Sequence, residues 1–300
     1  MDNNRISSKE VGLEIGLVLG RFLFNTEHLH YGYWPDDLPV KPSNLKEAQG
    51  LHSKLILDAI PEGVQTILDV GSGSGGLAGK MIAAGYQVHC VSPSEYLADR
   101  IEENLGEKVR VFRSTFEDLI LNENYDLVLF SESFQYVKIL KALNKVITAT
   151  GAAGHLLICD FFRRPGTGSR PLGGGHDWTT FQDRISELPL QEILNKDITT
   201  ETAPTMDILT TFINEVAEPV QTLSARYLDS HYPGVMKMLR WYFAKRIAKI
   251  NRIYFSGSLT SEMFNRMKTY RLLLYRTIPD NKGIEKSHRE DSNLRPAHYE

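Results

Sequence analysis

One glycine-rich segment constrains the fold of this chain more than any other feature. The apolar run Ile67–Val70 leads directly into Gly71–Gly76, where four of six residues are glycine. Glycine lets a backbone turn tightly and approach a ligand closely, because nothing projects from its Cα. The free N–H groups of a helix that starts after such a turn favour an electron-rich ligand group. The segment therefore predicts a strand, a ligand-binding turn and a helix, the repeating unit of an α/β fold.

The residues that follow alternate between strand-like and helix-like patterns. Strands are expected at Thr66–Val70, Gln87–Val91, Arg110–Arg113, Asp126–Phe130, His155–Phe161, Glu192–Thr199 and Tyr270–Ile278. Helices are expected between them at Leu77–Ala84, Glu95–Leu105, Val137–Thr148 and Thr179–Leu188. This order predicts an α/β protein with a Rossmann-like, doubly wound, seven-stranded sheet.

Four parts are expected along the chain. They are an N-terminal helical cap (1–60), a sheet domain (61–202 and 268–279), a helical lid inserted between the last two strands (203–267) and a disordered tail (280–300). The tail has almost no large apolar residue to bury. Within the cap, Asn44 and Glu47 have the spacing of a capping box, which predicts the start of a second helix.

The composition is that of a globular chain, with 42% hydrophobic and 24% charged residues. The net charge of −3 argues against a nucleic-acid binder, whose domains are usually basic. The two cysteines, Cys90 and Cys159, lie in apolar runs and predict buried thiols in a reducing compartment. No apolar run approaches the ~18 residues of a membrane span, and the first residues lack the apolar segment of a signal peptide. A soluble, cytoplasmic protein is therefore expected.

The glycine segment has the pattern Asp69-x-Gly71-x-Gly73-x-Gly75, with an acid at the end of the strand and no Lys-Ser/Thr pair. This pattern resembles motif I of the class I S-adenosylmethionine-dependent methyltransferases, and the resemblance extends from about residue 45 to 162 and to the final strand. It implies S-adenosyl-L-methionine as the cofactor and S-adenosyl-L-homocysteine as the product. By the same resemblance, Gly71, Ser72 and Gly73 admit the methionine half of the cofactor, and Asp69 fixes the loop and the ammonium side.

The turn after the second strand departs from the family pattern. Most members have an acid there that holds the ribose hydroxyls, whereas this chain has Ser92-Pro93-Ser94. A similar segment occurs in a subgroup that includes γ-tocopherol methyltransferase, the geranyl diphosphate C-methyltransferases and the cyclopropane fatty acid synthases. Because hydroxyls can also bond a ribose, Ser92 and Ser94 are candidate ribose contacts, and Pro93 between them is a candidate cofactor contact. A helix N-cap is the other interpretation of Ser94. After the third strand, Phe116 is a candidate to flank the adenine ring, and Glu117 or Asp118 to accept a hydrogen bond from its amino group.

The residues after the fourth strand lie where doubly wound folds bind their ligands. A carboxylate that follows an apolar strand is partly desolvated, which raises its pKa towards that of a general base. The tocopherol and geranyl diphosphate enzymes similarly carry Glu-Ser here, so Glu132 is the candidate base; an ion-paired loop residue is the alternative. Ser131 is expected at the cofactor, and Gln135 and Tyr136 at the substrate.

The aromatic stretch His28–Trp34 resembles a His-x-Gly-Tyr-like segment that folds over the cofactor in the same subgroup. Aromatic faces and phenol oxygens suit the positive charge of a methylsulfonium. His30 and Tyr31 are therefore candidate catalytic residues and Tyr33 a candidate cofactor contact, with plain packing as the alternative. No metal is expected, because the histidines have no Cys or acid at ligand spacing. His176 lies in a glycine-rich loop that is interpreted either as a flap near the substrate or as a linker.

The expected lid contains an apolar stripe with 3-4-4-3-4 spacing: Met236, Leu239, Phe243, Ile247, Ile250 and Tyr254. Lysines and arginines flank it, and no acid occurs between Val235 and Leu259. We expect a lid helix that packs this stripe on the sheet domain and places Trp241 at the substrate. Contact of the basic face with an anionic head group, a membrane surface or an acidic carrier protein stays open.

Together these features predict a methyltransferase that acts on a carbon or oxygen of a hydrophobic small molecule, such as an isoprenoid, quinol or lipid, as a monomer or homodimer. Two alternatives stay open: an N-methyltransferase of a small polar or phosphorylated amine, and a non-catalytic partner subunit that binds S-adenosylmethionine. A dehydrogenase would need a ribose-binding acid where Ser92 stands.

Overall fold

The computed structural model describes residues 12, 14, 17–22, 26, 28, 30–167, 172–255 and 257–279. The strands are β1 (Thr66–Val70), β2 (Gln87–Val91), β3 (Arg110–Phe112), β4 (Leu127–Ser131), β5 (His155–Arg163), β6 (Leu190–Asp197) and β7 (Lys268–Thr277). The α-helices are α2 (Leu45–Asp58), α3 (Gly76–Ala83), α4 (Glu95–Leu105), α5 (Ile139–Thr150), α6 (Trp178–Ser186), α7 (Thr199–Thr202), α8 (Pro204–Phe212), α9 (Glu218–His231), α10 (Pro233–Tyr242), α11 (Ala244–Tyr254) and α12 (Ser261–Met267). Short 3-10 turns occur at Pro42–Asn44, Gly106–Lys108, Phe134–Tyr136 and Gly151–Ala153, and a π-helical turn at Ile213–Ala217.

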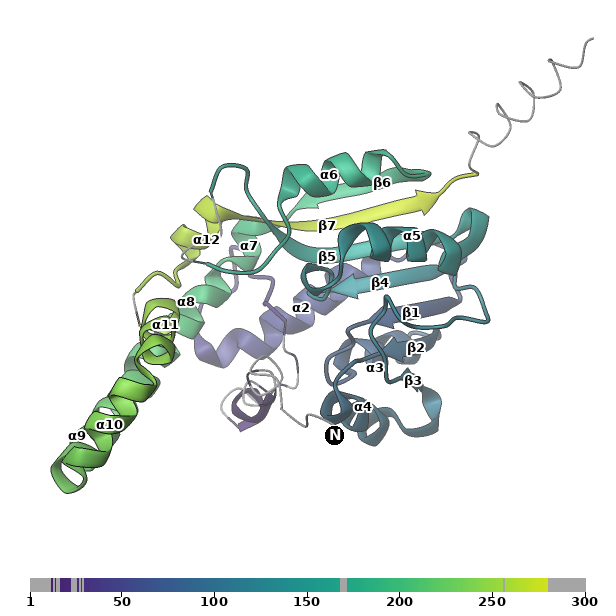
Figure 1. The fold of residues 1–300 in the computed structure, drawn as a ribbon. Coiled ribbons are helices and arrows are strands. Elements are labelled where there is room, and N and C mark those ends of the chain that lie inside the picture. The colour runs from purple at the N-terminus through teal and green to yellow at the C-terminus, as the bar shows by residue number, and fades with distance from the viewer. Residues whose placement is uncertain are drawn as a thin grey trace, which may run out of the picture.

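The strands form one sheet in the order β3-β2-β1-β4-β5-β7-β6 (Figure 1). β1 to β5 are parallel, whereas β7 runs antiparallel to both β5 and β6. The predicted seven-stranded, doubly wound sheet is confirmed. Because the strand order reverses between β1 and β4, a ligand-binding crevice is expected at the carboxyl ends of these two strands.

Two apolar layers enclose the sheet, because side chains alternate between its faces along each strand. On β4, Leu129 faces one layer, and Val128 and Phe130 face the other. The first layer contains residues of α2, α3, α4, α8 and α12, and the second contains residues of α5 and α6. Cys90 and Cys159 are buried free thiols, as predicted.

The expected capping box at the start of α2 is wrong. Asn44 has helical backbone angles (φ −97°, ψ 0°) and makes no side-chain cap. Its amide donates instead to the carbonyl oxygen of Pro39 (3.0 Å), because a 3-10 turn precedes the helix and removes the extended geometry that an N-cap needs. Much of the expected N-terminal cap and the whole expected disordered tail lie outside the described residues.

The insertion between β6 and β7 differs from the expected lid. α8 and α12 do pack on the sheet domain, through Met206, Phe264 and Met267. In contrast, α9, α10 and α11 contain no buried residue and project from the body (Figure 1). The predicted stripe is also interrupted, because Phe243 leaves helical geometry (φ −96°, ψ 11°) between α10 and α11. The periodic pattern predicted an amphipathic helix correctly but not what would cover its apolar face.

No helix among the described residues combines the length and the hydropathy needed to cross a lipid bilayer.

Candidate active site

The glycine loop between β1 and α3 is open towards the crevice. Gly71, Gly73 and Gly75 all have positive φ angles (76°, 57° and 85°), which side chains rarely adopt. The Gly71 N–H donates to the carbonyl oxygen of Val91 (2.8 Å), which ties the loop to β2. A Cβ at Gly73 would have no atom within 4 Å, so this position faces free space.

Two polar atoms beside this loop are buried without a hydrogen-bond partner among the described residues: Asp69 Oδ2 on β1 and Ser131 Oγ on β4. Burial raises the pKa of Asp69 to about 7. Unpaired buried polar atoms are costly and rare in folded proteins. Their place at the carboxyl ends of adjacent strands, next to open space at Gly73, fits a polar ligand in the crevice. The neighbouring Ser72 hydroxyl donates to the backbone oxygen of Asp69 (2.8 Å) and so supports the loop.

Ser92, Pro93 and Ser94 form the turn into α4. The Ser92 hydroxyl donates to the carbonyl oxygen of Ser94 (3.2 Å) and accepts from the Ser94 N–H (3.3 Å). Ser94 Oγ accepts from the N–H of Leu97 (3.3 Å), so Ser94 is the N-cap that was one of its two interpretations. A role of these residues at a ribose stays a prediction.

Phe116 and Glu117 have structural partners. Phe116 is buried and packs edge-on against Phe130, with ring centroids 5.3 Å apart. Glu117 Oε1 accepts from the N–H of Lys138 at the start of α5 (2.8 Å). Contact of either residue with an adenine ring stays a prediction. Both side chains already have a partner within the protein.

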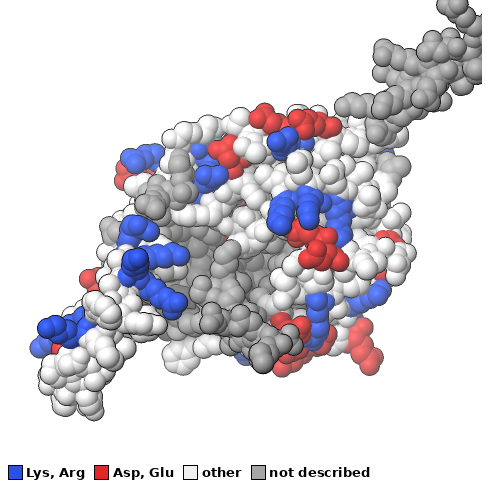
Figure 2. All heavy atoms as spheres, viewed as in Figure 1, with Lys and Arg blue, Asp and Glu red and all other residues white. Residues whose placement is uncertain are grey.

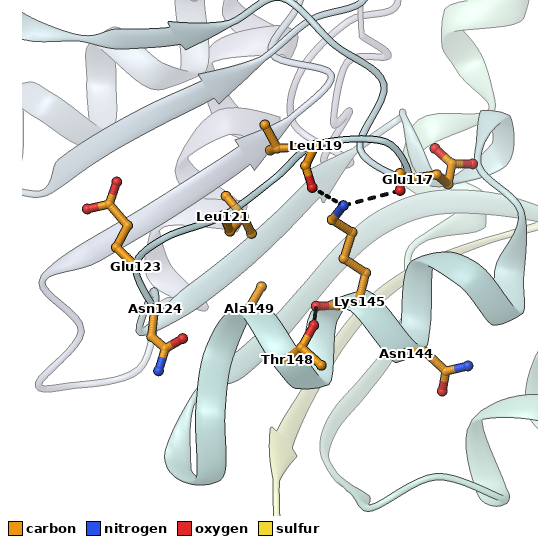
Figure 3. Close-up of a pocket in the computed structure, with 9 residues that line it drawn as sticks. All are labelled: Glu117, Leu119, Leu121, Glu123, Asn124, Asn144, Lys145, Thr148 and Ala149. Carbon is orange, nitrogen blue, oxygen red and sulfur yellow. Dashed lines mark hydrogen bonds between the residues drawn. The ribbon is translucent and has the colours of Figure 1, made fainter.

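A hollow of about 450 Å³ lies between the β3–β4 connection and α5 (Figure 3). The Lys145 ammonium donates to the carbonyl oxygens of Glu117 (3.2 Å) and Leu119 along its wall. Asn124 and Ala149 line it beside the amino-terminal end of β4, whereas Glu132 follows the carboxyl end. The hollow is therefore separate from the glycine loop and the candidate base.

Glu132 is the one non-glycine residue with a positive φ (54°) in the described part of the chain. Such a backbone conformation costs roughly 1–3 kcal/mol and persists only where the surroundings impose it. The Tyr31 N–H (2.6 Å) and the Tyr270 hydroxyl (2.7 Å) both donate to Glu132 Oε1. Burial nevertheless raises the pKa of Glu132 to about 8. A carboxyl group that is held at one oxygen and titrates near neutrality is suited to general-base chemistry.

The structure adds three residues around Glu132 that sequence reasoning missed. Tyr270 OH lies 3.0 Å from His52 Nε2, which continues the hydrogen-bonded path that begins at Glu132. Asp160 on β5 is buried and accepts from the N–H of Gln135 (3.0 Å), and burial raises its pKa to about 7. Asp160 interrupts the apolar run Leu156–Phe162, which was the available signal for it. His52 and Tyr270 have polar neighbours in the sequence and gave no such signal.

Three histidine rings lie one after another beside this path, with His28 tilted against His30 and His30 stacked on His52. The ring centroids of His28 and His30 are 4.6 Å apart, as are those of His30 and His52. Burial lowers the pKa of His28 to about 3 and of His30 to about 4, so both are neutral at pH 7. His30 Nδ1 donates to the carbonyl oxygen of Tyr31 (2.8 Å), which leaves Nε2 as an acceptor that lies 3.4 Å from the Ser53 hydroxyl.

His30, His52 and Glu132 each offer a donor atom, and these atoms lie within 4.8 Å of one another. Two donors that share a divalent transition metal lie at most about 4.2 Å apart, because each bond is about 2.1 Å long. The group would therefore need to contract slightly to hold an ion. Sequence analysis did not anticipate this grouping, because His52 is distant in sequence and lies on the buried face of α2.

The aromatic segment before α2 joins three elements. The Tyr31 ring lies 5.4 Å from that of Phe264 on α12, and its hydroxyl donates to Met206 Sδ on α8 (3.2 Å). Tyr31 therefore reaches Glu132 through its backbone and the insertion through its side chain. The Tyr33 ring lies beneath Lys196 of β6, four strands from β1, so the structure does not bring it to the glycine loop.

Replacing Gly32 by Ala is expected to destabilise the fold by about 1–3 kcal/mol. The new Cβ would lie 2.6 Å from Ala48 Cβ and 2.9 Å from Trp34 Nε1, so the aromatic segment would have to leave α2. Gly50 in α2 is the matched control, since a Cβ there meets nothing within 4 Å. Gly50→Ala is expected to stabilise by about 0.5–1 kcal/mol. Urea unfolding of both variants measures the contrast, and equal effects would contradict the close packing.

The predicted substrate residues divide into two groups. Gln135 contacts Asp160 beside Glu132, and Tyr136 next to it is exposed. His176 Nε2 donates to the carbonyl oxygen of Phe134 (2.9 Å) and so anchors its loop beside the same segment. Trp241 is different: it lies on the projecting α10 with 80% of its surface exposed, so the structure does not bring it to Glu132.

Hydrogen bonds hold residues 172–177, the loop before α6, against the body of the protein. The Lys268 ammonium donates to the carbonyl oxygens of Gly173 (3.0 Å) and Gly174 (2.6 Å). Asp177 accepts from the N–H of Thr180 (3.0 Å) as the N-cap of α6. Of the two interpretations of this segment, the described residues favour the linker with a helix cap.

Residues 67–154, which contain the glycine loop and Glu132, match the family model of a methyltransferase domain. Over these residues the chain is similar to methyltransferase domains, and its overall fold is that of solved methyltransferases. Solved structures with this fold contain S-adenosylmethionine, S-adenosyl-L-homocysteine or sinefungin, which supports S-adenosylmethionine as the cofactor. The open space at Gly73 and the unpaired Asp69 Oδ2 and Ser131 Oγ fit a ligand of that size and polarity. No curated protein matches the chain in sequence.

Solved structures with the same fold match most of this chain. A protein described as a putative sarcosine dimethylglycine methyltransferase from Galdieria sulphuraria has a TM-score of 0.64 and 14% identity, over 88% of this chain and 98% of that one. Geranyl diphosphate C-methyltransferase from Streptomyces coelicolor A3(2), solved with Mg²⁺, geranyl-S-thiolodiphosphate and S-adenosyl-L-homocysteine, has a TM-score of 0.64 and 14% identity, over 92% of this chain and 95% of that one.

The [4+2]-cyclase SpnF has the same TM-score of 0.64 with 16% identity, over 91% of this chain and 96% of its own. At these identities the likeness establishes the fold. It leaves the reaction open, because a fold hosts many chemistries and the site decides among them.

Proposed function

We propose that this protein transfers the methyl group of S-adenosylmethionine to a carbon or oxygen of a hydrophobic small molecule, with Glu132 as the general base. The observation that carries the proposal is the position of Glu132. It is held in a strained conformation by Tyr31 and Tyr270, it lies at the end of β4 beside the glycine loop, and burial raises its pKa to about 8.

Each residue of the site has a defined task in this proposal. The glycine loop, Asp69 and Ser131 would hold the cofactor, which supplies an electrophilic methyl group when bound. The Tyr31 and Tyr270 donors fix Glu132 Oε1, so Oε2 is the oxygen that takes a proton from the acceptor. α8 and α12 close the apolar side and exclude water. Most of the rate then comes from positioning.

The lining of the site supports an apolar acceptor. Around Tyr31 lie the rings of Phe161, Phe264 and Tyr270, with centroids 6.0, 5.4 and 5.8 Å away. Aromatic faces also stabilise the positive charge that develops during methyl transfer to carbon. A phosphorylated amine as acceptor has less support. The lysines and arginines that would bind its phosphate lie on α10 and α11, which project from the body and do not cover the site.

Calorimetric titration of the protein with S-adenosylmethionine, S-adenosylhomocysteine and NAD tests the first half of the proposal. Binding of the two sulfur ligands and not of NAD is expected. A screen for transfer of a labelled methyl group, beginning with prenyl and quinol compounds, tests the second half. Binding without transfer to any acceptor class would favour the partner-subunit alternative, and transfer to amines alone would favour the N-methyltransferase.

The value of kcat/KM is expected to rise with pH, with an apparent pKa of about 8. This profile reports the pKa values of groups in the free enzyme. The base must be deprotonated to act, and Glu132 loses its proton with a pKa of about 8. A positively charged sulfonium nearby favours the carboxylate, so the corresponding limb of kcat should lie at lower pH. Because burial also raises the pKa of Asp69 and Asp160 to about 7, the assignment needs a variant. The limb must disappear in Glu132→Gln; if it persists unchanged, another group is the base.

A further inference from the structure

Helices α9, α10 and α11 form an arm, Glu218–Tyr254, that projects from the body of the protein (Figure 1). None of its residues is buried. Folded proteins rarely leave an apolar surface of this extent without a partner. The arm does not contribute to the proposed active site, so its surface needs a separate explanation.

Each helix of the arm has an exposed apolar face. On α10 this face consists of residues at helical spacing: Val235 (50% exposed), Met238 (59%), Leu239 (37%) and Tyr242 (72%). On α9 the corresponding residues are Val220, Leu223 and Tyr227, and on α11 they are Ile247, Ile250 and Tyr254, all exposed. Trp241, exposed at 80%, borders the face of α10. Exposed tryptophan and tyrosine are the side chains that favour the boundary between water and lipid.

The opposite side of the same helices is basic. At 100° per residue, Lys237 and Arg240 lie opposite the apolar face of α10, and Lys245, Lys249 and Arg252 lie opposite that of α11. No acid occurs in residues 230–261. The arm carries seven Lys or Arg and two acids, a net charge of +5, so the rest of the chain has −8. Figure 2 shows Lys and Arg side chains recurring along the projecting arm.

We propose that the arm docks the protein on an anionic phospholipid surface. A helix with one apolar face bearing aromatic residues and one face rich in Lys and Arg lies in the plane of a membrane interface. Lysine and arginine side chains close to the membrane surface are also attracted to anionic headgroups. A second copy of the chain fits less well, since pairing two arms would bring their excess positive charges together. The body, with a net charge of −8, would be repelled from the same surface, so the arm alone would make the contact.

Cosedimentation of the full chain with vesicles tests the proposal. Binding is expected to vesicles of phosphatidylcholine with phosphatidylglycerol and not to phosphatidylcholine alone, and to weaken with salt. The triple variant Lys245→Gln, Lys249→Gln, Arg252→Gln should lower partitioning by roughly 100-fold. The matched control replaces three exposed lysines of the body, Lys41, Lys108 and Lys141, by Gln and should not weaken binding.

Fluorescence gives an independent readout of insertion. Brominated lipids should quench the emission of Trp241, and this quenching should be lost in Trp241→Phe, while the buried Trp34 stays unquenched in both proteins. Equal binding to neutral and anionic vesicles, or unchanged binding of the triple variant, would overturn the proposal. So would a dimer in sedimentation velocity that Met238→Ser and Tyr242→Ser dissociate in a protein that binds no vesicles. The result does not depend on the proposed methyl transfer.

Discussion

Glu132→Gln is expected to lower turnover by about 100-fold or more while leaving S-adenosylmethionine binding intact. Gln has nearly the shape of Glu, and its amide oxygen can still accept from the Tyr31 N–H and the Tyr270 hydroxyl, so the strained turn should keep its geometry. The variant loses only the oxygen that can take a proton. Measurement of kcat with the acceptor found by the methyl-transfer screen, together with calorimetry for the cofactor, separates the two effects.

Glu192→Gln is the matched control for this variant. Glu192 Oε2 also accepts from a tyrosine hydroxyl of β7, that of Tyr275 (3.1 Å), but it lies exposed on the edge strand β6. Its replacement should leave turnover unchanged. If Glu132→Gln retains wild-type turnover and the control does too, Glu132 has only a structural role, and methyl transfer then needs either no base or another one.

The sheet was predictable because its signals are local. Each parallel strand is a short apolar run between turn residues, and the predicted limits of β1 and β2 agree with those observed. The predicted limits of the later strands differ from the observed ones by at most two residues, since the ends of strands depend on pairing. β5, for example, extends to Arg163 because β7 pairs with it over its whole length.

Glu132 could be found from the sequence because a carboxylate directly after an apolar strand is conspicuous. Its partners Tyr270 and His52 could not, because they come from β7 and α2 and meet Glu132 only after the chain has folded. The prediction that α10 and α11 form a lid was wrong for a related reason. An apolar stripe shows which face of a helix avoids water, but α10 and α11 carry such a stripe without packing it on the body.

Gly73→Leu is expected to weaken S-adenosylmethionine binding by roughly 100-fold or more, equivalent to about 2.7 kcal/mol. Gly73 faces free space beside Asp69 and Ser131, the space that the cofactor would occupy, so a leucine side chain would fill it. The substitution also strains the backbone, since φ is 57° there. Calorimetric titration with S-adenosylhomocysteine measures the loss without turnover.

Gly63→Leu separates the two contributions. Gly63 also has a positive φ (84°), and a Cβ there also meets nothing within 4 Å, but it lies in the loop before β1 and away from the crevice. Both variants should therefore lose stability to a similar, small extent, whereas only Gly73→Leu should lose the ligand. If both bind S-adenosylhomocysteine as tightly as the unmodified protein, the cofactor does not lie against Gly73. The unpaired Asp69 and Ser131 would then need another ligand.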